Sequence, residues 1–380
     1  MKNSNISYFP TGIVTGEAFC NRGKERALLK KRLEQNAHVV LMSPRRYGKS
    51  SLIAQFTLDL KLPYSSVDLL PATSSRYVRN AITDGVVNLI NEITPNLKKS
   101  KERILNIFSS MNPVIELSAF EQKVKLTPLE KTPEESIMKL LLSLDKAACE
   151  MDKKLIFVMD EFQQIANLEE SHSLEASIRH AVERSRNVFY VFSGSNRTLL
   201  KAMFKSKDRP LYHLCDEIKI NRIDKESYCK FIEKAAKNNW KKSISKESID
   251  EILILTECHP YYLNRLCRTL LDFKHPPLKN EVVKVWDEYV ETQKLDWVSE
   301  VISRMSVNQK TILAALAKAP EEEPRGKNFS TKLAMSSSSI QRTINTLQQK
   351  DFIFKDSKGC YRVLNPVIKS YLSDNEYFDF

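Results

Sequence analysis

The sequence predicts an α/β fold, in which a parallel sheet core carries helices on both faces. Five short segments have the character of strands, three of them as continuous apolar runs, and stretches with helical spacing separate them. The predicted strands are Val39–Met42, Pro63–Leu69, Leu155–Met159, Val188–Phe192 and Asp216–Ile220. Continuous apolar runs are typical of strands buried on both faces, and alternation of strands with helices builds a parallel sheet.

The spacing of apolar residues predicts helices between these strands. Arg26–Leu33 precedes the first strand, Ser50–Leu60 follows it, and another helix lies around Ser173–Arg186. The stretch from Ser74 to about Cys149 is predicted as mostly helical. Breaks in this stretch are expected near Pro95, Pro113 and Pro128.

After Arg222 the strand signal disappears. Helices are predicted at Asp224–Trp240, Ser245–Thr256 and Leu263–Phe273, with a turn at Glu257–Tyr262 before the last of them. We therefore expect a core domain over residues 1–220 and a helical lid domain over residues 221–300.

The last segment, 301–380, has the order of a winged helix. Its helices are predicted at Asn308–Leu316, Ser330–Met335 and Ile340–Lys350. A hairpin is predicted to follow, with strands at Phe352–Lys355 and Cys360–Val363. Three helices followed by a hairpin define the expected third domain.

Composition argues against several classes of protein. Of 380 residues, 42% are hydrophobic and 28% are charged, as in a soluble globular protein. No apolar stretch reaches the length of a membrane span, and the N-terminus has no secretory apolar segment. Seven cysteines without C-x-x-C spacing and six scattered histidines favour reduced thiols in a cytoplasm over disulfides or zinc. The formal net charge of +12 favours an anionic partner.

The most informative segment follows the first predicted strand. Its residues form a tight turn that runs into a helix, Ser43-Pro44-Arg45-Arg46-Tyr47-Gly48-Lys49-Ser50-Ser51. In such a turn, successive backbone N–H groups form a nest for an anion, and the helix N-terminus adds partial positive charge. Lys49 can reach the β- and γ-phosphates of ATP, and the Ser50 hydroxyl can coordinate Mg²⁺.

One position departs from the usual phosphate-binding pattern. Ser43 stands where the pattern begins with glycine. Serine resists a positive φ, so we expect this replacement to weaken nucleotide affinity. Gly48 supplies the backbone freedom nearer to the helix. The motif alone leaves open a chance Gly-Lys-Ser at a helix start.

A second segment supports nucleotide binding. Lys154–Phe162 is an apolar run that contains two carboxylates near its end, Asp160 and Glu161. At the carboxyl end of a parallel strand, Asp160 can bind Mg²⁺ directly or through water, beside the phosphate loop. Glu161 is then placed to orient and deprotonate the attacking water. A buried strand that meets an acidic turn is the alternative for the pair taken alone.

A third strand end carries small polar residues. Val188–Phe192 is followed by Ser193, Ser195 and Asn196, which are candidates to sense the γ-phosphate or to hold the water. Ser193 is our catalytic candidate among them. An ordinary strand-to-helix turn explains the same residues equally well.

These blocks together resemble one family, the archaeal-type ATPases of the P-loop STAND/AAA+ superfamily (MNS-like clade), which are also common in bacteria. The matching segments are Pro44–Ser50, Val158–Gln163, Ser193–Ser195, Arg209–Tyr212 and His259–Tyr262. The resemblance covers about residues 10–270, and a C-terminal winged helix is its usual companion. It implies an ATP-driven switch with a P-loop NTPase core, a helical lid and a winged-helix domain.

The resemblance also assigns roles to further residues. His259-Pro260 is similar to the lid motif that touches adenine or phosphate, and a helix breaker is the alternative. Arg209 is similar to an arginine that stabilises transition-state charge, often across a subunit boundary, which implies a nucleotide-dependent homo-oligomer. A solvated surface charge is the alternative for Arg209. Cys258 stands where glycine commonly precedes His-Pro, so we expect stiffer lid closure.

The winged helix raises the question of what nucleotide binding controls. Its third helix presents Ser338, Gln341, Arg342 and Asn345, and the hairpin adds Lys358. These residue types suit the phosphates and base edges of double-stranded DNA, although winged helices also dock proteins. The sequence thus predicts a slow ATPase switch coupled to this module. The alternative is a protein that holds nucleotide without turnover and acts through DNA or protein binding.

Overall fold

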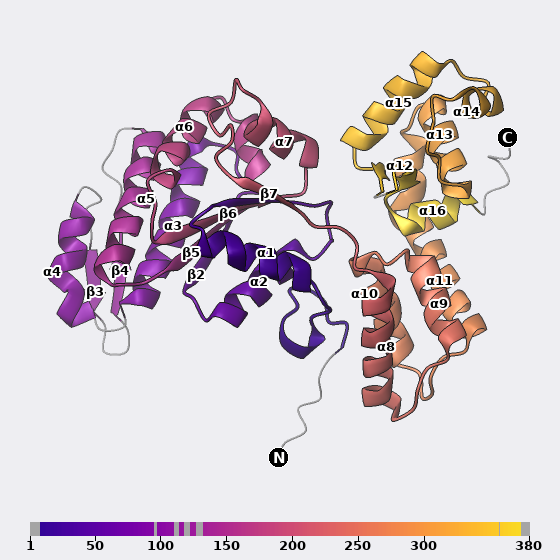
Figure 1. The fold of residues 1–380 in the computed structure, drawn as a ribbon, viewed down its shortest axis with the longest axis horizontal. Coiled ribbons are helices and arrows are strands. Elements are labelled where there is room, and N and C mark those ends of the chain that lie inside the picture. Colours follow the sequence, from indigo (N-terminus) through magenta and orange to yellow (C-terminus); the bar gives the residue numbers. More distant parts are fainter. Residues whose placement is uncertain are drawn as a thin grey trace. The chain divides into compact units, whose positions relative to one another are not determined.

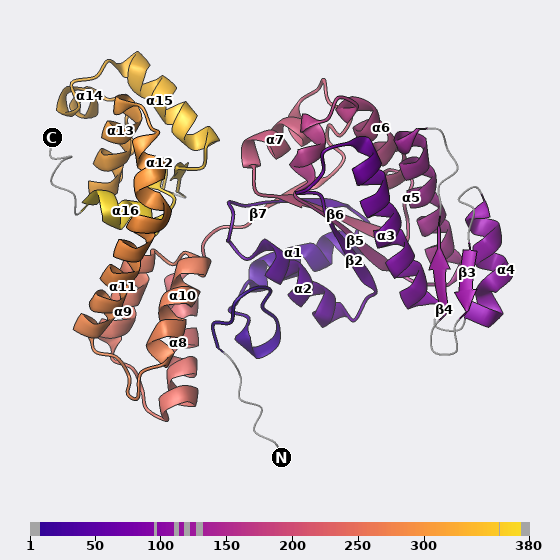
Figure 2. The ribbon, with the colours of Figure 1, turned by 180° about the vertical axis from the view of Figure 1, so that it is seen from behind.

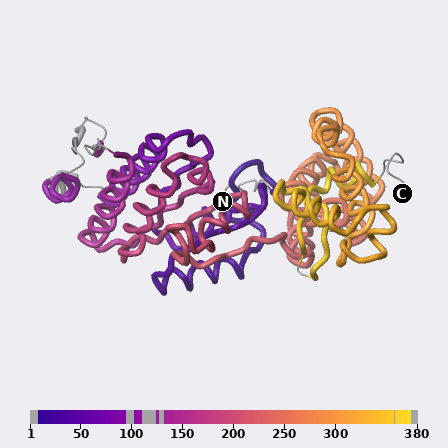
Figure 3. Tube along the Cα trace, turned by 90° about the horizontal axis from the view of Figure 1, so that it is seen from above, coloured from indigo at the N-terminus to yellow at the C-terminus, as the bar shows by residue number. Residues whose placement is uncertain are grey.

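The computed structural model describes residues 8–94, 97–109, 114–117, 122–126, 132–356 and 358–373. The chain forms two compact units, one of Ile13–Asn221 and one of Met1–Gly12 with Arg222–Phe380 (Figure 1). It passes between them at residues 12–13 and 221–222, and its path can be followed along the Cα trace in Figure 3. The predicted boundary between lid and winged helix, at residue 300, falls inside the second unit and stays a prediction.

The unit Ile13–Asn221 is built on a five-stranded parallel sheet with the strand order β2-β5-β6-β1-β7. The strands are β1 (Val39–Met42), β2 (Tyr64–Asp68), β5 (Leu155–Asp160), β6 (Val188–Gly194) and β7 (Asp216–Lys219). The central strands β5, β6 and β1 are buried along nearly their whole length, which confirms the predicted α/β core. Because all five strands run in the same direction, the residues after them collect at one edge of the sheet.

Helices cover both faces of this sheet (Figures 1 and 2). One face carries α3 (Ser75–Ile93), α5 (Pro133–Glu150) and α6 (Ser171–Val182), and the other carries α1 (Gly23–Glu34) and α2 (Lys49–Leu60). Alternate residues of β1, β5 and β6 enter the two cores, as the period of a strand requires.

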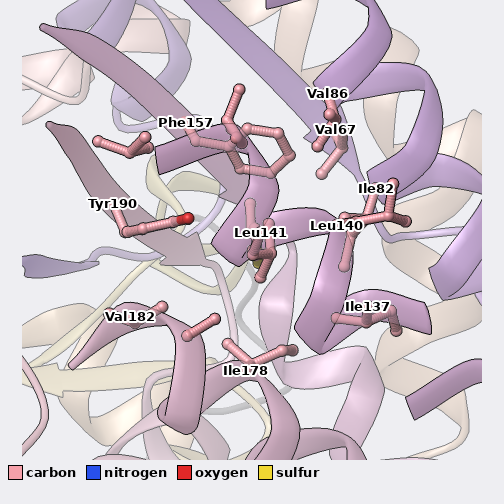
Figure 4. Close-up of a cluster of buried hydrophobic side chains, with 14 of the residues drawn as sticks. Val67, Ile82, Val86, Ile137, Leu140, Leu141, Phe157, Ile178, Val182 and Tyr190 are labelled. Atoms are coloured by element: carbon pink, nitrogen blue, oxygen red, sulfur yellow. The ribbon is translucent and has the colours of Figure 1, made fainter. Parts of the chain in front are cut away.

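Apolar side chains of β5 and β6 meet those of α5 in the larger core. Figure 4 shows Phe157 and Tyr190 facing Leu140 and Leu141, all of them fully buried. A further helix, α7 (Arg197–Lys205), follows β6 and adds its apolar side to the same core.

The prediction of a mostly helical segment between Ser74 and Cys149 was wrong at one place. After α4 (Leu97–Ile107), the strands β3 (Val114–Leu117) and β4 (Gln122–Lys125) form an antiparallel pair. The hydrogen bonds of each of these four-residue strands come from the other, and the apolar spacing of one segment does not record that pairing. The predicted breaks at Pro95, Pro113 and Pro128 lie outside the described residues.

The second unit consists of helices and one small hairpin. Its helices are α8 (Lys225–Trp240), α9 (Lys246–Thr256), α10 (Pro260–Leu271), α11 (Lys279–Gln293), α12 (Ser299–Ser303), α13 (Val307–Lys318), α14 (Lys327–Lys332), α15 (Ser337–Gln349) and α16 (Pro366–Ser373). A π-helical turn, Lys294–Val298, joins α11 to α12. The helices α13 to α15 are followed by the antiparallel strands β8 (Ile353–Lys355) and β9 (Tyr361–Val363), which is the winged-helix order that the sequence predicts.

Two features of these helices differ from the prediction. The helix α10 begins at Pro260, whereas the predicted turn extended to Tyr262. Proline suits the first helical position because its missing N–H has no intrahelical partner there. The final helix, α16, was not predicted. Within the described part of the chain, no helix has the length and apolar character that crossing a membrane requires.

Arg222 ties the helices after residue 222 to the winged helix. Its Nη1 donates to Glu257 Oε2 at 2.7 Å, and its Nη2 donates to the Leu364 carbonyl at 2.9 Å. Lys369 of α16 donates to the other Glu257 oxygen at 2.6 Å. Burial raises the pKa of Glu257, but Arg222 and Lys369 outweigh that effect and hold the pKa below its ordinary value. Arg222, the first residue of the second unit after Asn221, is therefore held by contacts within the second unit.

Asp145 of α5 fixes the turn that leads into β6. One of its carboxylate oxygens, Oδ1, accepts hydrogen bonds from Ser185 Oγ and from the backbone N–H groups of Arg186, Asn187 and Val188, at 2.7–3.1 Å. The substitution Asp145→Ala leaves these donors without that acceptor, so we expect a loss of about 3 kcal/mol in the free energy of unfolding.

Urea denaturation of the Asp145→Ala chain, followed by far-ultraviolet circular dichroism, measures this loss. Lys146→Ala is the matched control, because Lys146 is the exposed neighbour on the same helix. We expect the control to stay within about 0.5 kcal/mol of the wild type. A loss below about 1 kcal/mol in Asp145→Ala would contradict the prediction.

Candidate active site

The loop between β1 and α2 has the backbone conformation of an anion nest. Arg46 and Gly48 take left-handed φ values of 66° and 83°, and α2 begins directly after them at Lys49. A Cβ added to Gly48 would meet no atom within 4 Å, so glycine is favoured here by the backbone angle and not by space. Ser43 does not have a positive φ, so the backbone conflict expected for a serine there does not arise.

Ser43 contributes a polar atom at the start of this loop. The residue is fully buried, and its Oγ has no hydrogen-bond partner in the structure. A buried hydroxyl without a partner is costly, and an acceptor such as a phosphate oxygen would satisfy it. This atom and the left-handed turn fit a phosphate group in the loop.

A buried ion cluster lies where the loop and β5 meet. Lys49 Nζ is 2.5 Å from Asp160 Oδ1 and 3.2 Å from Glu161 Oε1. The side chains are only 9%, 19% and 15% exposed, respectively. Two hydroxyls complete the cluster: Ser50 Oγ donates to Asp160 Oδ2 at 3.3 Å, and Ser193 Oγ donates to Asp160 Oδ1 at 2.6 Å. The structure therefore brings together Lys49, Ser50, Asp160, Glu161 and Ser193, as the sequence analysis expected of these site residues.

The charges of the cluster control its protonation. Burial by itself raises the pKa of Asp160, but the Lys49 ammonium and the hydrogen bonds from Lys49 and Ser193 lower it below its ordinary value. The pKa of Glu161 is likewise lowered: burial and Asp160 raise it, while Lys49 and two neutral hydrogen-bond donors prevail. Both carboxylates are therefore ionised at neutral pH and can act as metal ligand and as base.

Glu161 has a second set of partners on its other oxygen. Gln163 Nε2 donates to Glu161 Oε2 at 2.6 Å, and Ser195 Oγ donates to the same atom at 2.7 Å. Arg45 of the phosphate loop donates from Nε to Ser195 Oγ at 3.3 Å. A chain of polar contacts thus links the loop to this carboxylate. In the sequence, Gln163 stands out only as part of Val158–Gln163, a segment that resembles the ATPase family. Its hydrogen bond to Glu161 could not be predicted, because it depends on a turn that the sequence does not specify.

Arg22 is a second residue whose role in the structure was not predicted. It is 4% exposed with a φ of 68°, and it donates to the Tyr47 carbonyl at 2.9 Å, to the Asn221 carbonyl at 2.5 Å and to Glu25 at 2.9 Å. It therefore fixes the phosphate loop to the last residue of its unit. The available signal was an arginine four residues ahead of the predicted helix Arg26–Leu33, but its partners lie up to 199 residues away in the chain.

Arg209 is bound within its own unit. Its guanidinium forms a two-point ion pair with Glu175 of α6, whose side chain is fully buried, with one contact at 3.2 Å. Burial raises the pKa of Glu175, and Arg209 only partly offsets this effect. Arg209 is 26% exposed, so the alternative of a solvated surface charge does not describe it. Its predicted part in transition-state stabilisation stays a prediction.

His259 and Pro260 lie in the second unit, at the start of α10. The two residues before them, Glu257 and Cys258, have left-handed φ values of 48° and 56°. This explains why glycine is the usual residue before His-Pro, because a side chain at such an angle is strained. Contact of His259 and Pro260 with a nucleotide stays a prediction.

The winged-helix candidates lie on α15 and the hairpin. Ser338, Arg342 and Asn345 are exposed and follow one another at helical spacing, while Gln341 is half-buried and donates to Asn345 Oδ1 at 2.6 Å. Lys358 is exposed in the turn between β8 and β9. They form a polar surface with positive charge, and their contact with DNA stays a prediction.

A parallel sheet, a phosphate loop at the end of β1 and two carboxylates at the end of β5 define a P-loop ATPase. Residues 19–266 match the model of an ATPase domain that is found predominantly in Archaea, and residues 297–374 match the model of a probable winged helix domain. Because the first match covers more than half of the 380 residues, the chain belongs to this ATPase family.

Solved structures show the same fold. The Walker-type ATPase PAby2304 of Pyrococcus abyssi is 19% identical, with a TM-score of 0.68 over 96% of this chain and 99% of that one. The ADP form of the Aeropyrum pernix ORC2 protein is 10% identical, with a TM-score of 0.50 over 96% and 98%. At these identities the likeness shows the fold alone. A comparison with curated protein sequences finds no match.

The cluster predicts how stability depends on pH. Because the folded-state pKa values of Asp160 and Glu161 lie below their ordinary 3.8 and 4.5, the cluster stabilises fully above about pH 5 and loses this effect as pH falls through those lowered values. Lys49→Met leaves two buried carboxylates without their cation, so we expect about 3 kcal/mol lower stability at pH 7.

The deficit of Lys49→Met is expected to shrink as the pH falls to 4, because the unpaired carboxylates bind protons more readily in the variant. Urea denaturation at pH 7, 5 and 4 measures it without nucleotide. Lys24→Met, which removes an exposed charge from α1, is the control. A deficit that does not change with pH would count against the ion cluster.

Proposed function

We propose that this protein binds and slowly hydrolyses ATP and that its nucleotide state controls a winged-helix module. The observation that carries the proposal is the cluster of Lys49, Asp160 and Glu161 beside the left-handed phosphate loop. Family membership supports ATP binding, and the cluster supplies the groups that hydrolysis needs.

The cluster residues divide the work between binding and chemistry. Lys49 would bind the β- and γ-phosphates, and the loop residues Ser43 to Ser51, except Pro44, would surround them with backbone N–H groups. Ser50 and Asp160 offer hard oxygen ligands to Mg²⁺, with Ser50 Oγ already 3.3 Å from Asp160 Oδ2. When bound, Mg²⁺ neutralises phosphate charge. Glu161 takes the proton of the attacking water, and Ser193 orients Asp160 through its 2.6 Å hydrogen bond.

Low turnover is consistent with the ion pairs in the structure. Lys49 is bound to both carboxylates, and it must exchange these contacts for phosphate oxygens when ATP enters. Arg209 and His259-Pro260 would contribute on closure or assembly, as the family resemblance implies. A homo-oligomer that depends on nucleotide belongs to the same proposal. Seven free thiols among the described residues support a reducing, cytoplasmic location.

The partner proposed for the winged helix is double-stranded DNA. The helix α15 exposes Ser338, Arg342 and Asn345, which follow one another at helical spacing and can form hydrogen bonds in a DNA groove. Lys358 offers a contact to a phosphate. The net charge of +12 supports an anionic partner. A protein partner is the alternative outcome of the binding test below.

The substitution Glu161→Gln tests the enzyme function. It removes the base and keeps the shape of the side chain, so we expect phosphate release to fall at least about a hundredfold while ATP binding is retained. Phosphate release and binding of a fluorescent ATP analogue measure the two effects. Glu169→Gln, an exposed carboxylate before α6, is the control. If the wild type binds ATP and releases no phosphate, the protein is a nucleotide-binding module without turnover.

Salt titration of DNA binding tests the partner. Each lysine or arginine that neutralises a phosphate adds to the salt dependence, so Arg342→Ala combined with Lys358→Ala should lower the slope of log K against log salt by about 2. Fluorescence anisotropy of a labelled duplex measures it. Lys237→Ala combined with Lys246→Ala removes equal charge from exposed positions on α8 and α9. If the affinity changes neither with salt concentration nor in the variant with Arg342→Ala and Lys358→Ala, DNA is excluded as the partner.

A further inference from the structure

The two oxygens of the Glu161 carboxylate have different surroundings. Oε1 lies 3.2 Å from Lys49 Nζ. Oε2 accepts two hydrogen bonds, from Gln163 Nε2 at 2.6 Å and from Ser195 Oγ at 2.7 Å. Since Lys49 is needed at the phosphates, Oε1 is the oxygen that becomes available when ATP binds, whereas Oε2 stays held by neutral donors.

The backbone of Glu161 has a strained conformation that needs support from neighbouring side chains. Glu161 has a left-handed φ of 50°, at a cost of about 1 kcal/mol for a residue with a Cβ. Such an angle persists only where the surroundings enforce it. Gln163 and Ser195 grip the side chain from two elements, the short helical turn Phe162–Asn167 and the end of β6.

Gln163 packs closely against Gly194 at the end of the neighbouring strand β6. The residue is 3% exposed. A Cβ added to Gly194 would lie 1.9 Å from Gln163 Oε1 and 2.9 Å from Leu200 Cδ1. Gly194 does not have a positive φ, so the limit on a side chain at this position comes from space and not from the backbone angle. Because Gly194 has no side chain, β6 leaves room for the amide of Gln163.

A purely structural account of Gln163 is unsatisfactory. Its Oε1 is buried without a hydrogen-bond partner, which costs about 1–3 kcal/mol. Leucine or methionine would fill the same space without that cost. The hydrogen bond to Glu161 is the gain that the amide offers in exchange.

We propose that Gln163 is a positioning residue for Glu161: together with Ser195 it holds Oε2, so that Oε1 faces the attacking water. This inference rests on the proposed ATPase function. As water attacks the γ-phosphorus, the new O–P bond forms and the water proton passes to Oε1. The bond to the bridging oxygen breaks, and its electron pair leaves with ADP. Gln163 touches none of these atoms and acts only through Glu161.

Gln163→Leu in the full chain tests the proposal. We expect kcat to fall at least tenfold, while KM and the affinity for the ATP analogue stay within twofold. Gln163→Met, a second variant of similar length without a donor, gives the same results if Leu disturbs folding. The matched control is Gln164→Leu, on the same turn, where the amide contacts Asn167.

Gly194→Ala provides an independent variant, because the added methyl displaces Gln163 without removing it. It should lower kcat as Gln163→Leu does, and the double variant should be no worse than either single one. Wild-type turnover together with an unchanged kcat in Gln163→Leu and Gln163→Met overturns this inference and leaves the proposed function intact. Absence of wild-type turnover overturns the proposed hydrolysis, and this inference with it.

Discussion

The contact between Lys49 and the carboxylates of Asp160 and Glu161 is the constraint on which the site depends. One buried ammonium faces two partly buried carboxylates, and loss of that cation leaves both carboxylates without their charge partner. The strand order makes this contact possible. The end of β1 and the end of β5 lie at one edge of a parallel sheet, with β6 between them. The residues that end β6 therefore reach both carboxylates, and Ser193 and Ser195 supply the hydroxyls that bind them.

Left-handed backbone angles occur at three residues near this cluster, as they do at others along the chain. Arg22, Arg46 and Glu161 all take left-handed angles that cost a residue with a Cβ about 1 kcal/mol. At these positions the Arg22 side chain donates a hydrogen bond of 2.9 Å, and the Glu161 side chain accepts one of 2.6 Å. Glu257 in the second unit likewise combines a left-handed angle with a bound side chain. Its carboxylate binds Arg222 and Lys369, and it lies shortly before His259-Pro260.

Sequence patterns predicted the parts of the fold in which each segment carries its own signal. The apolar strands β1, β5 and β6, the turn before Lys49 and the acidic pair after β5 are local, and the structure has them where they were expected. The pair β3-β4 was missed because its hydrogen bonds join two short segments that have no strong pattern alone. Arg209 was assigned by resemblance, and its ion pair with Glu175 could not be foreseen, since nothing near either residue records the other.

The sequence by itself determined the class of the protein: apolar strands that end in a phosphate loop and in paired carboxylates, followed by helices and a small hairpin. Only the tertiary structure decided which atoms meet. It placed Gln163 and Ser195 on one oxygen of Glu161 and Lys49 on the other, and it placed Arg22 on the carbonyls of Tyr47 and Asn221. The physical reason is that a pattern along the chain records burial and turns, whereas a hydrogen bond between distant residues depends on the packing of the strands and helices that carry them.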